Sequence, residues 1–190
     1  MAPTAPILDD WLPDPQIRTH HRRSSAADPD ALWAAANSVR LRQTRTIGRL
    51  VRWRIPGVAP EQTFAGLLGE YPFVVLDAGE HHMISGLCGR IWTLARDYPH
   101  LDGPEAFRAW HEPRTVRVVF AHWVERGPDG ASTLVSESRV QPTDGVAAMR
   151  LRSLWLVVGP FERLIGAEPL ALATAAAEAA TRPDTAPGVR

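Results

Sequence analysis

The stretch TDGVAAMRLRSLWLVVGPFERLIGAEPLALATAAAEAA, residues 143–180, decides the fold of this chain. It is one long helical pattern, because its apolar residues recur at spacings of three and four and give a helix one apolar face. Thr143 or Asp144 is expected to cap this helix. The Gly159–Pro160 pair predicts a bend, since a proline inside a helix removes a backbone hydrogen bond. The apolar face consists of Ala147, Leu151, Leu154, Val158, Phe161 and Ile165.

Several β-strands are expected before this helix, because short apolar or β-branched runs alternate there with turn residues. The segment RGPDGA (126–131) combines Pro, Asp and Gly and predicts a hairpin. The expected strands are IRTHHRRSS (17–25) at a sheet edge, PFVVLDAGEHH (72–82), MISGLCGRIWTL (83–94), EAFRAWHE (105–112), TVRVVFAHWVE (115–125) and STLVSESRVQ (132–141).

Helices are expected between the first and second of these strands. In residues 27–41, Asp28 is suited to an N-cap and Pro29 to the first helical position. Helical or irregular segments follow at 47–57 and 60–70. A strand-rich middle followed by one long amphipathic helix predicts an α+β fold, in which an antiparallel sheet packs against the C-terminal helix.

Composition limits the organisation of the chain and its partners. The 190 residues, 45% of them hydrophobic, suit one domain over 16–180, with a flexible Pro-rich lead-in over 1–15 and a disordered tail over 181–190. The 21 basic and 21 acidic residues balance, so no nucleic-acid partner is expected. No apolar run reaches the roughly 18 residues of a membrane span. The protein is expected to be a monomer or a homodimer.

Cysteine and histidine usage gives further expectations. The single Cys88 forms no internal disulfide and no reactive-thiol pattern surrounds it, which favours a reducing, cytoplasmic location. The seven histidines show no zinc-type spacing, and neighbouring histidines on a strand point to opposite faces. No metal and no cofactor are therefore expected.

Strand parity separates the side chains of the last two strands into two faces, because successive residues point to opposite sides. In residues 116–124 the more apolar set contains Val118, Phe120 and His122, so His122 is expected to point inward. Ser136 and Ser138 share one face of the return strand, and their small hydroxyls leave space there. His21 has the parity to reach the same interior from the edge strand.

Glu137 and Arg139 lie on the opposite face of the return strand. They are expected to form a solvated or structural charge ladder with Arg117 or Glu125. The alternative is that Arg139 binds a ligand carboxylate at the rim of an interior cavity.

The order of short strand, helices, antiparallel strands and long helix resembles the START-like (SRPBCC) superfamily, the polyketide cyclase/dehydrase and lipid-transport type. HRRSSAADPDALWAAA (21–36) is similar to its first strand and helix, and SGLCGRIW (85–92) to a Gly-rich central strand of one bacterial branch. STLVSESRVQPTD (132–144) followed by LRSLWLVVGPFERLI (151–165) resembles that branch's hallmark. Two departures are Ser138, where the branch has Thr, and Pro169, inside a helix that usually runs unbroken.

This resemblance implies a helix-grip fold, in which a curved sheet wraps around the long C-terminal helix and leaves a cavity between them. The bend at Gly159–Pro160 would hold the helix against the sheet at one end and away from it at the other, unless it only follows the curvature of the sheet. The residues expected to line the cavity are Met83, Ser85, Leu87, Phe107, Trp110, Val118, Phe120, Ser136, Ser138, Leu151, Trp155 and Val158.

Three functions follow as alternatives. The first is a carrier or sensor of a small hydrophobic molecule, aromatic or polyketide-like, for which the Trp and Phe side chains would supply flat walls. The second is a cofactor-independent cyclase/aromatase in which His122 or His21 is the acid–base group, unless each is a core histidine that donates to a backbone carbonyl. The third is an interaction module with a collapsed cavity.

Overall fold

A computed structural model describes residues 6–55, 57–93, 98–127, 130–159 and 162–181, with the backbone alone described at 53, 54 and 162–165. The elements in chain order are η1 (Leu8–Asp10), β1 (Ile17–Ser25), α1 (Pro29–Ser38), η2 (Leu41–Gln43), α2 (Ile47–Arg54), α3 (Phe64–Leu68), β2 (Val74–Gly79), β3 (His82–Gly89), α4 (Pro104–Arg108), β4 (Val116–Arg126), β5 (Ser132–Pro142), α5 (Gly145–Val158) and α6 (Glu162–Thr181).

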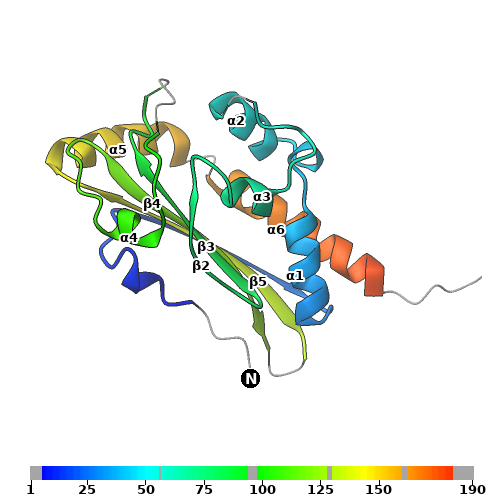
Figure 1. The fold of residues 1–190 in the computed structure, drawn as a ribbon. Helices are drawn as coiled ribbons and strands as arrows, with labels where there is room; N and C mark the ends of the chain where they lie inside the picture. The colour runs from blue at the N-terminus through cyan, green and yellow to red at the C-terminus, as the bar shows by residue number, and fades with distance from the viewer. Residues whose placement is uncertain (1–5, 56, 94–97, 128–129, 160–161, 182–190) are drawn as a thin grey trace, which may run out of the picture.

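Five antiparallel strands form one sheet in the order β1-β5-β4-β3-β2. The first strand returns to pair with the last, so β1 is an edge strand, as its polar sequence predicts. β4 and β5 form the predicted hairpin, with Arg126 opposite Ser132. The sheet and the C-terminal helices give the α+β helix-grip fold expected from the sequence (Figure 1).

The C-terminal helical stretch is described as α5 and α6, which lie on either side of residues 160 and 161. Asp144 caps α5 by accepting the backbone N–H of Ala147 at 2.7 Å. α5 ends at Val158, Gly159 is its C-cap residue, and α6 begins at Glu162. Figure 1 shows α5 over one end of the sheet and α6 over the other. Residues 160 and 161 lie outside the described part of the chain, as does the tail over 182–190.

We call the side of the sheet that faces α1, α5 and α6 the inner face and the other side the outer face. Two apolar clusters cover the inner face. One packs under α1 and α6 around Leu32, Leu134 and Leu170, and the other packs under α5 around Val118 and Leu151. Apolar side chains therefore fill the space between the sheet and the helices at both ends of the inner face.

The outer face is covered as well, by the N-terminal segment and α4 (Figure 1). Leu8, Trp11 and Leu12 are buried there, and Leu12 has no exposed surface. The prediction of a flexible lead-in is wrong for this segment. Its prolines stop regular structure, but its three large apolar side chains bury more surface on the sheet than a loose segment would.

The strand predicted over 105–112 is also wrong, because the chain forms the short helix α4 there. Pro104 occupies the first helical turn. Phe107 lies in α4, and the turn that follows, with the Trp110 N–H bonded to the Phe107 carbonyl, brings both side chains to the same cluster, whereas a strand would point them to opposite sides. The other predicted strands are present, but β2 ends at Gly79 rather than 82 and β3 ends at Gly89, short of the predicted 94.

Candidate functional site

A cavity of about 320 Å³ lies on the inner face, beneath the interruption between α5 and α6. Trp155 and Val158 line it from the end of α5, and Pro169 and Ala173 from α6. It therefore occupies the gap between the two inner clusters. The sequence prediction linked the Gly-Pro pair to such a space; Pro160 itself lies outside the described residues, and the described residues on either side of it, Val158 and Gly166, line the cavity.

Two rows of paired residues form the floor of the cavity. In one row Ser136 on β5 pairs with His21 on β1 and with His122 on β4. In the next row Ser138 pairs with Thr19 and Phe120, and the hydroxyls of Thr19 and Ser138 lie 2.6 Å apart. Directly paired side chains point to the same face with Cβ atoms about 5 Å apart. The hydroxyl of Ser136 thus lies between two imidazoles.

His122 is a neutral imidazole on the cavity wall. Burial, with a smaller contribution from the charge of His82, lowers its pKa to about 4. Its ring stacks on Trp33 of α1, with the ring centroids 5.2 Å apart. Within the described parts of the chain its nitrogens have no hydrogen-bond partner, so the expected donation to a backbone carbonyl is not found. The ring is free to accept a hydrogen bond from a ligand.

His21 is packed against the backbone of α6. A Cβ atom at Gly166 would lie 2.1 Å from Nε2 of His21, which is far inside van der Waals contact. Only glycine at position 166 therefore allows this imidazole and the helix to approach each other so closely. The sequence analysis identified His21 as a site residue but missed Gly166, because the two are 145 positions apart and no local pattern joins them.

α2 and α3 close the cavity on the remaining side, and the sequence analysis did not assign them to it. Ile47 and Val51 of α2 and Phe64 of α3 line the cavity. Glu168 of α6 holds the start of α2 by accepting the backbone N–H groups of residues 45–47. Burial raises the pKa of Glu168, but these N–H donors lower it more, and the carboxylate stays charged.

The residues predicted to line the cavity fall into three groups. Phe120, Ser136, Ser138, Trp155 and Val158 lie on its wall. Met83 and Ser85 pair with His122 and Phe120 on the inner face but do not reach the wall, and Leu87, Val118 and Leu151 belong to the packed cluster beneath α5. Phe107 and Trp110 are the third group.

Phe107 and Trp110 lie on the outer face, so their assignment to the cavity is wrong. Both misassignments result from the strand predicted at α4, since α4 and the turn after it lie on the outer face, away from the interior. Phe107 is fully buried and meets Trp11 edge to face, with ring centroids 6.3 Å apart. A Cβ atom at Gly86 would lie 2.7 Å from the Phe107 ring, so this strand glycine makes room for the aromatic side chain.

The Glu137–Arg139 pair is structural, and it is buried rather than solvated. Arg139 donates to Glu137 at 2.6 Å, to Asp9 and to the backbone carbonyl of Leu12, while Arg18 also pairs with Glu137. These bonds hold the N-terminal segment on the outer face. The alternative role of Arg139 at the cavity rim is excluded by its position on the other side of the sheet.

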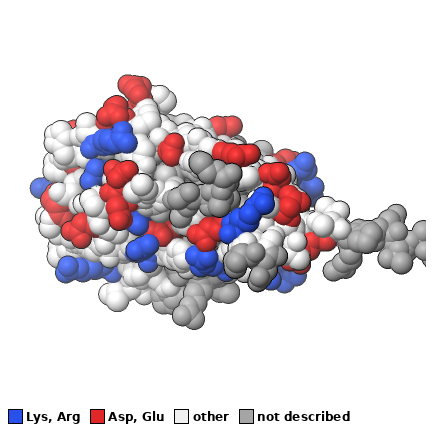
Figure 2. All heavy atoms as spheres, turned by 90° about the horizontal axis from the view of Figure 1, so that it is seen from below, with Lys and Arg blue, Asp and Glu red and all other residues white. Residues whose placement is uncertain are grey.

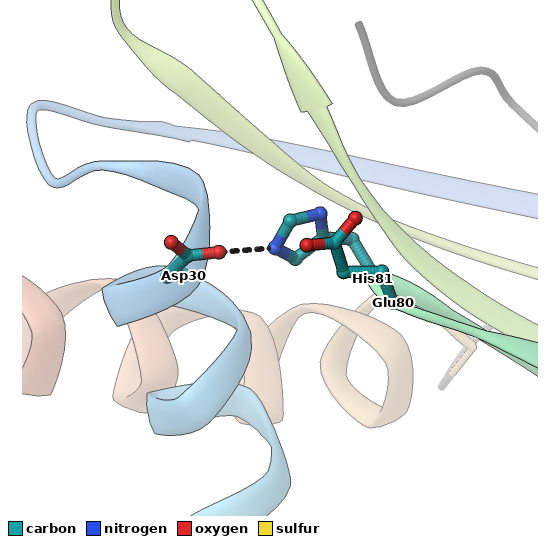
Figure 3. A group of neighbouring side chains, drawn as sticks. All are labelled: Asp30, Glu80 and His81. Atoms are coloured by element: carbon teal, nitrogen blue, oxygen red, sulfur yellow. Dashed lines mark hydrogen bonds and ion pairs between the residues drawn. The ribbon is translucent and has the colours of Figure 1, made fainter. Parts of the chain in front are cut away.

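One group of side chains has the composition of a metal site. Asp30, Glu80 and His81 place three ligand atoms within 4.8 Å of one another at the surface (Figure 3). His81 and Asp30 share a hydrogen bond of 2.6 Å, which joins the start of α1 to the β2–β3 turn. That bond alone accounts for the arrangement. Cys88, by contrast, is fully buried, and burial raises the pKa of its thiol to about 12, so it is unreactive.

Comparison with known proteins bears on the fold. No family model and no curated protein sequence matches the chain. Several solved structures are similar to it. They include a hypothetical protein of Helicobacter pylori (9% identity, 96% of this chain and 98% of that chain covered, TM-score 0.41), the Zhui aromatase/cyclase of a Streptomyces species (13%, 89% and 98%, 0.38) and norcoclaurine synthase of Thalictrum flavum (13%, 86% and 85%, 0.38).

At these identities and TM-scores the likeness says nothing of activity. The helix-grip fold of this protein rests on its own five-stranded sheet and C-terminal helices. None of its described helices is long and apolar enough to cross a bilayer.

Proposed function

We propose that the protein binds one neutral, largely apolar small molecule in the inner cavity and acts as its carrier or sensor. The observation that supports this is the composition of the wall. Among the described residues that line the cavity there is no Asp, Glu, Lys or Arg. A charged ligand would lose its hydration there without gaining a counter-ion, which costs several kcal/mol. A neutral ligand avoids that penalty.

Most of the polar groups of the wall lie on one side. Thr19, Ser138 and Ser136 offer hydroxyls and His122 offers a ring nitrogen from the sheet, while the described helices contribute apolar side chains apart from the indole N–H of Trp155. This arrangement suits a ligand with one polar edge, such as a phenol or ketone, on an apolar ring system. The volume of about 320 Å³ accommodates a single compact molecule and counts against a collapsed interior.

Calorimetric titration with matched ligands tests this proposal. A panel of neutral polycyclic phenols is compared with carboxylates of the same ring systems. The neutral member of each pair should bind at least about tenfold more tightly, which corresponds to about 1.4 kcal/mol. Ser136→Phe fills the cavity and should abolish binding. Ser24→Phe, the same change at an exposed position of β1, should not. Equal or tighter binding of the carboxylates would contradict the proposal.

A second candidate function is proton abstraction by His122. The observation that favours it is the position of His122, an imidazole without a hydrogen-bond partner in the described chain on the wall of an apolar cavity. Burial lowers its pKa to about 4, so the ring is unprotonated at neutral pH, although a weaker base than an ordinary histidine. Such a group acts as a base rather than an acid at neutral pH, and general-base catalysis contributes about 10²–10⁴-fold to a rate.

His122→Phe separates this candidate from simple binding. Phe keeps an aromatic ring against Trp33 but has no basic nitrogen. If His122 is a base, kcat for a bound neutral ketone falls by about a hundredfold or more while KM changes little. Full activity in the variant excludes His122 as the base. If the wild type binds the ligand without turning it over, and the variant binds it equally well, the protein is a carrier or sensor.

A further inference from the structure

The helices that border the cavity carry an exposed surface that the proposed function does not use. On α5, Val146, Met149, Leu156 and Val157 are 40–81% exposed, and their spacing places them along one side of the helix. α2 exposes Leu50 at 42%. We call these five side chains the apolar rim. α5 is thus apolar on both sides, since its opposite side packs on the sheet through Leu151.

The charged side chains that α2 and α5 themselves carry are all positive, while Asp144 caps the start of α5 and Glu168 the start of α2. Arg49 and Arg52 of α2 and Arg150 and Arg152 of α5 are exposed, and neither helix contains an acidic residue. Within the described residues none of these four arginines forms an ion pair. The net charge of the whole chain is zero, so this is a local separation of charge.

Some other surface arginines have carboxylate partners. Arg22, Arg40, Arg42 and Arg108 each pair with a carboxylate. Figure 2 shows a face with basic and acidic side chains interspersed; it views the molecule from below, whereas α2 and α5 lie toward the top of Figure 1.

We propose that the apolar rim and its four arginines bind a membrane surface that contains anionic phospholipid. Interfacial helices have this composition, with apolar side chains that enter the headgroup region and arginines beside them that contact lipid phosphates. A second copy of the chain is a poor occupant, since it would bring arginines against arginines. Because Trp155 and Val158 line the cavity from the same turns of α5, bound lipid would lie beside the cavity.

This inference goes beyond the proposed function and does not need an occupied cavity. Sedimentation with vesicles therefore tests it without cargo, using the full chain with phosphatidylcholine vesicles and with phosphatidylcholine/phosphatidylglycerol vesicles. We expect binding to the anionic vesicles only, weakened by salt. Each of Arg49→Gln, Arg52→Gln, Arg150→Gln and Arg152→Gln should lower the partition coefficient about fivefold.

Variants of the apolar rim test its contribution with a matched control. The double change Met149→Glu, Leu156→Glu should lower partitioning more than about tenfold. Ile7→Glu should leave it unchanged, because Ile7 is 67% exposed but precedes the outer-face segment. All these positions are exposed, and unchanged circular dichroism and melting temperature confirm that each variant folds.

A fluorophore gives an independent readout of the contact. Because Cys88 is fully buried, a label can be attached selectively at Leu156→Cys, and at Ile7→Cys as the control. Anionic vesicles should shift the emission to shorter wavelength at position 156 only. Absence of binding to anionic vesicles, or equal binding by the wild type and the double variant, overturns the proposal. Binding of an acidic protein by the rim without vesicle binding would replace the lipid with a protein partner.

Discussion

The two faces of the sheet are built from alternate residues of the same strands, yet one is filled and the other encloses a cavity. On the outer face Val119, Ala121 and Trp123 of β4 pack tightly with Phe107 and Trp11. On the inner face Phe120 and His122 of the same strand border open space. The difference arises from what covers each face: large side chains on the outer face, and small hydroxyls beneath an interrupted helix on the inner face.

This difference suggests that stability and function reside on opposite sides of one sheet. The outer face contributes apolar burial and the buried Glu137–Arg139 pair. At its centre the inner face borders open space, where the His122 ring nitrogens have no hydrogen-bond partner among the described residues. A protein selected for stability alone would fill that space, because empty volume in a core is destabilising.

The largest expected effect is on the free energy of unfolding, when one aromatic ring is removed from each face of the sheet. Phe107→Ala should lower the free energy of unfolding by about 3–5 kcal/mol, because it leaves a void in a packed core. Phe120→Ala should cost roughly half as much, because one side of that ring already borders the cavity. Urea unfolding of the two variants measures both values, and equal losses would mean that the inner face is as tightly packed as the outer.

The pH dependence of stability reports on the inner face. The folded-state pKa of His122, about 4, lies below its ordinary value of 6.5, so the folded protein resists taking up this proton. The contribution of the neutral ring is complete above about pH 6.5 and is lost as the pH falls toward 4, by up to about 3 kcal/mol in all.

His122→Phe should flatten the stability profile in this window, whereas His100→Phe, at a side chain that is 76% exposed, should not. Thermal or urea unfolding measured between pH 4 and pH 7 gives the profiles. Identical profiles for the wild type and His122→Phe would show that the ring is hydrated and that the cavity wall is not apolar at this position.

The smallest expected effect concerns the contact between His21 and α6. Gly166→Ala alone should destabilise the protein by about 1 kcal/mol or more, because the new methyl group overlaps the imidazole. In a His21→Ala background the same change should stabilise by up to about 1 kcal/mol, since alanine favours a helix over glycine. A double-mutant cycle measures the reversal of sign, and additive effects would mean that the ring does not contact the helix.

The sequence predicts a feature of the fold when the residues that determine that feature are close together in the chain. Asp28 and Asp144 identify the starts of α1 and α5, and the parity of Phe120 and His122 identifies the inner face of β4. These features depend on neighbours within a few residues. The resemblance to a known fold then supplies the arrangement of the elements.

The mistaken strand at α4 is a local error, since Pro104 signals a helix start there, but the other errors involve contacts between distant segments. Neither the burial of Leu12 nor the place of Phe107 can be inferred locally, because both depend on which face of the sheet the segment meets. The close approach of Gly166 to His21 and the attachment of α2 by Glu168 are equally non-local. For these reasons the sequence identifies much of the cavity floor but misses part of its helical wall.

Native mass spectrometry of the protein purified from its own host tests the central proposal most directly. The cavity proposal predicts a discrete added mass in the range of a small neutral molecule, which is lost on denaturation. It should be absent from Ser136→Phe and retained by Ser24→Phe. A bare mass in the wild type even after incubation with the neutral panel, or an added mass that Ser136→Phe retains in full, would contradict it.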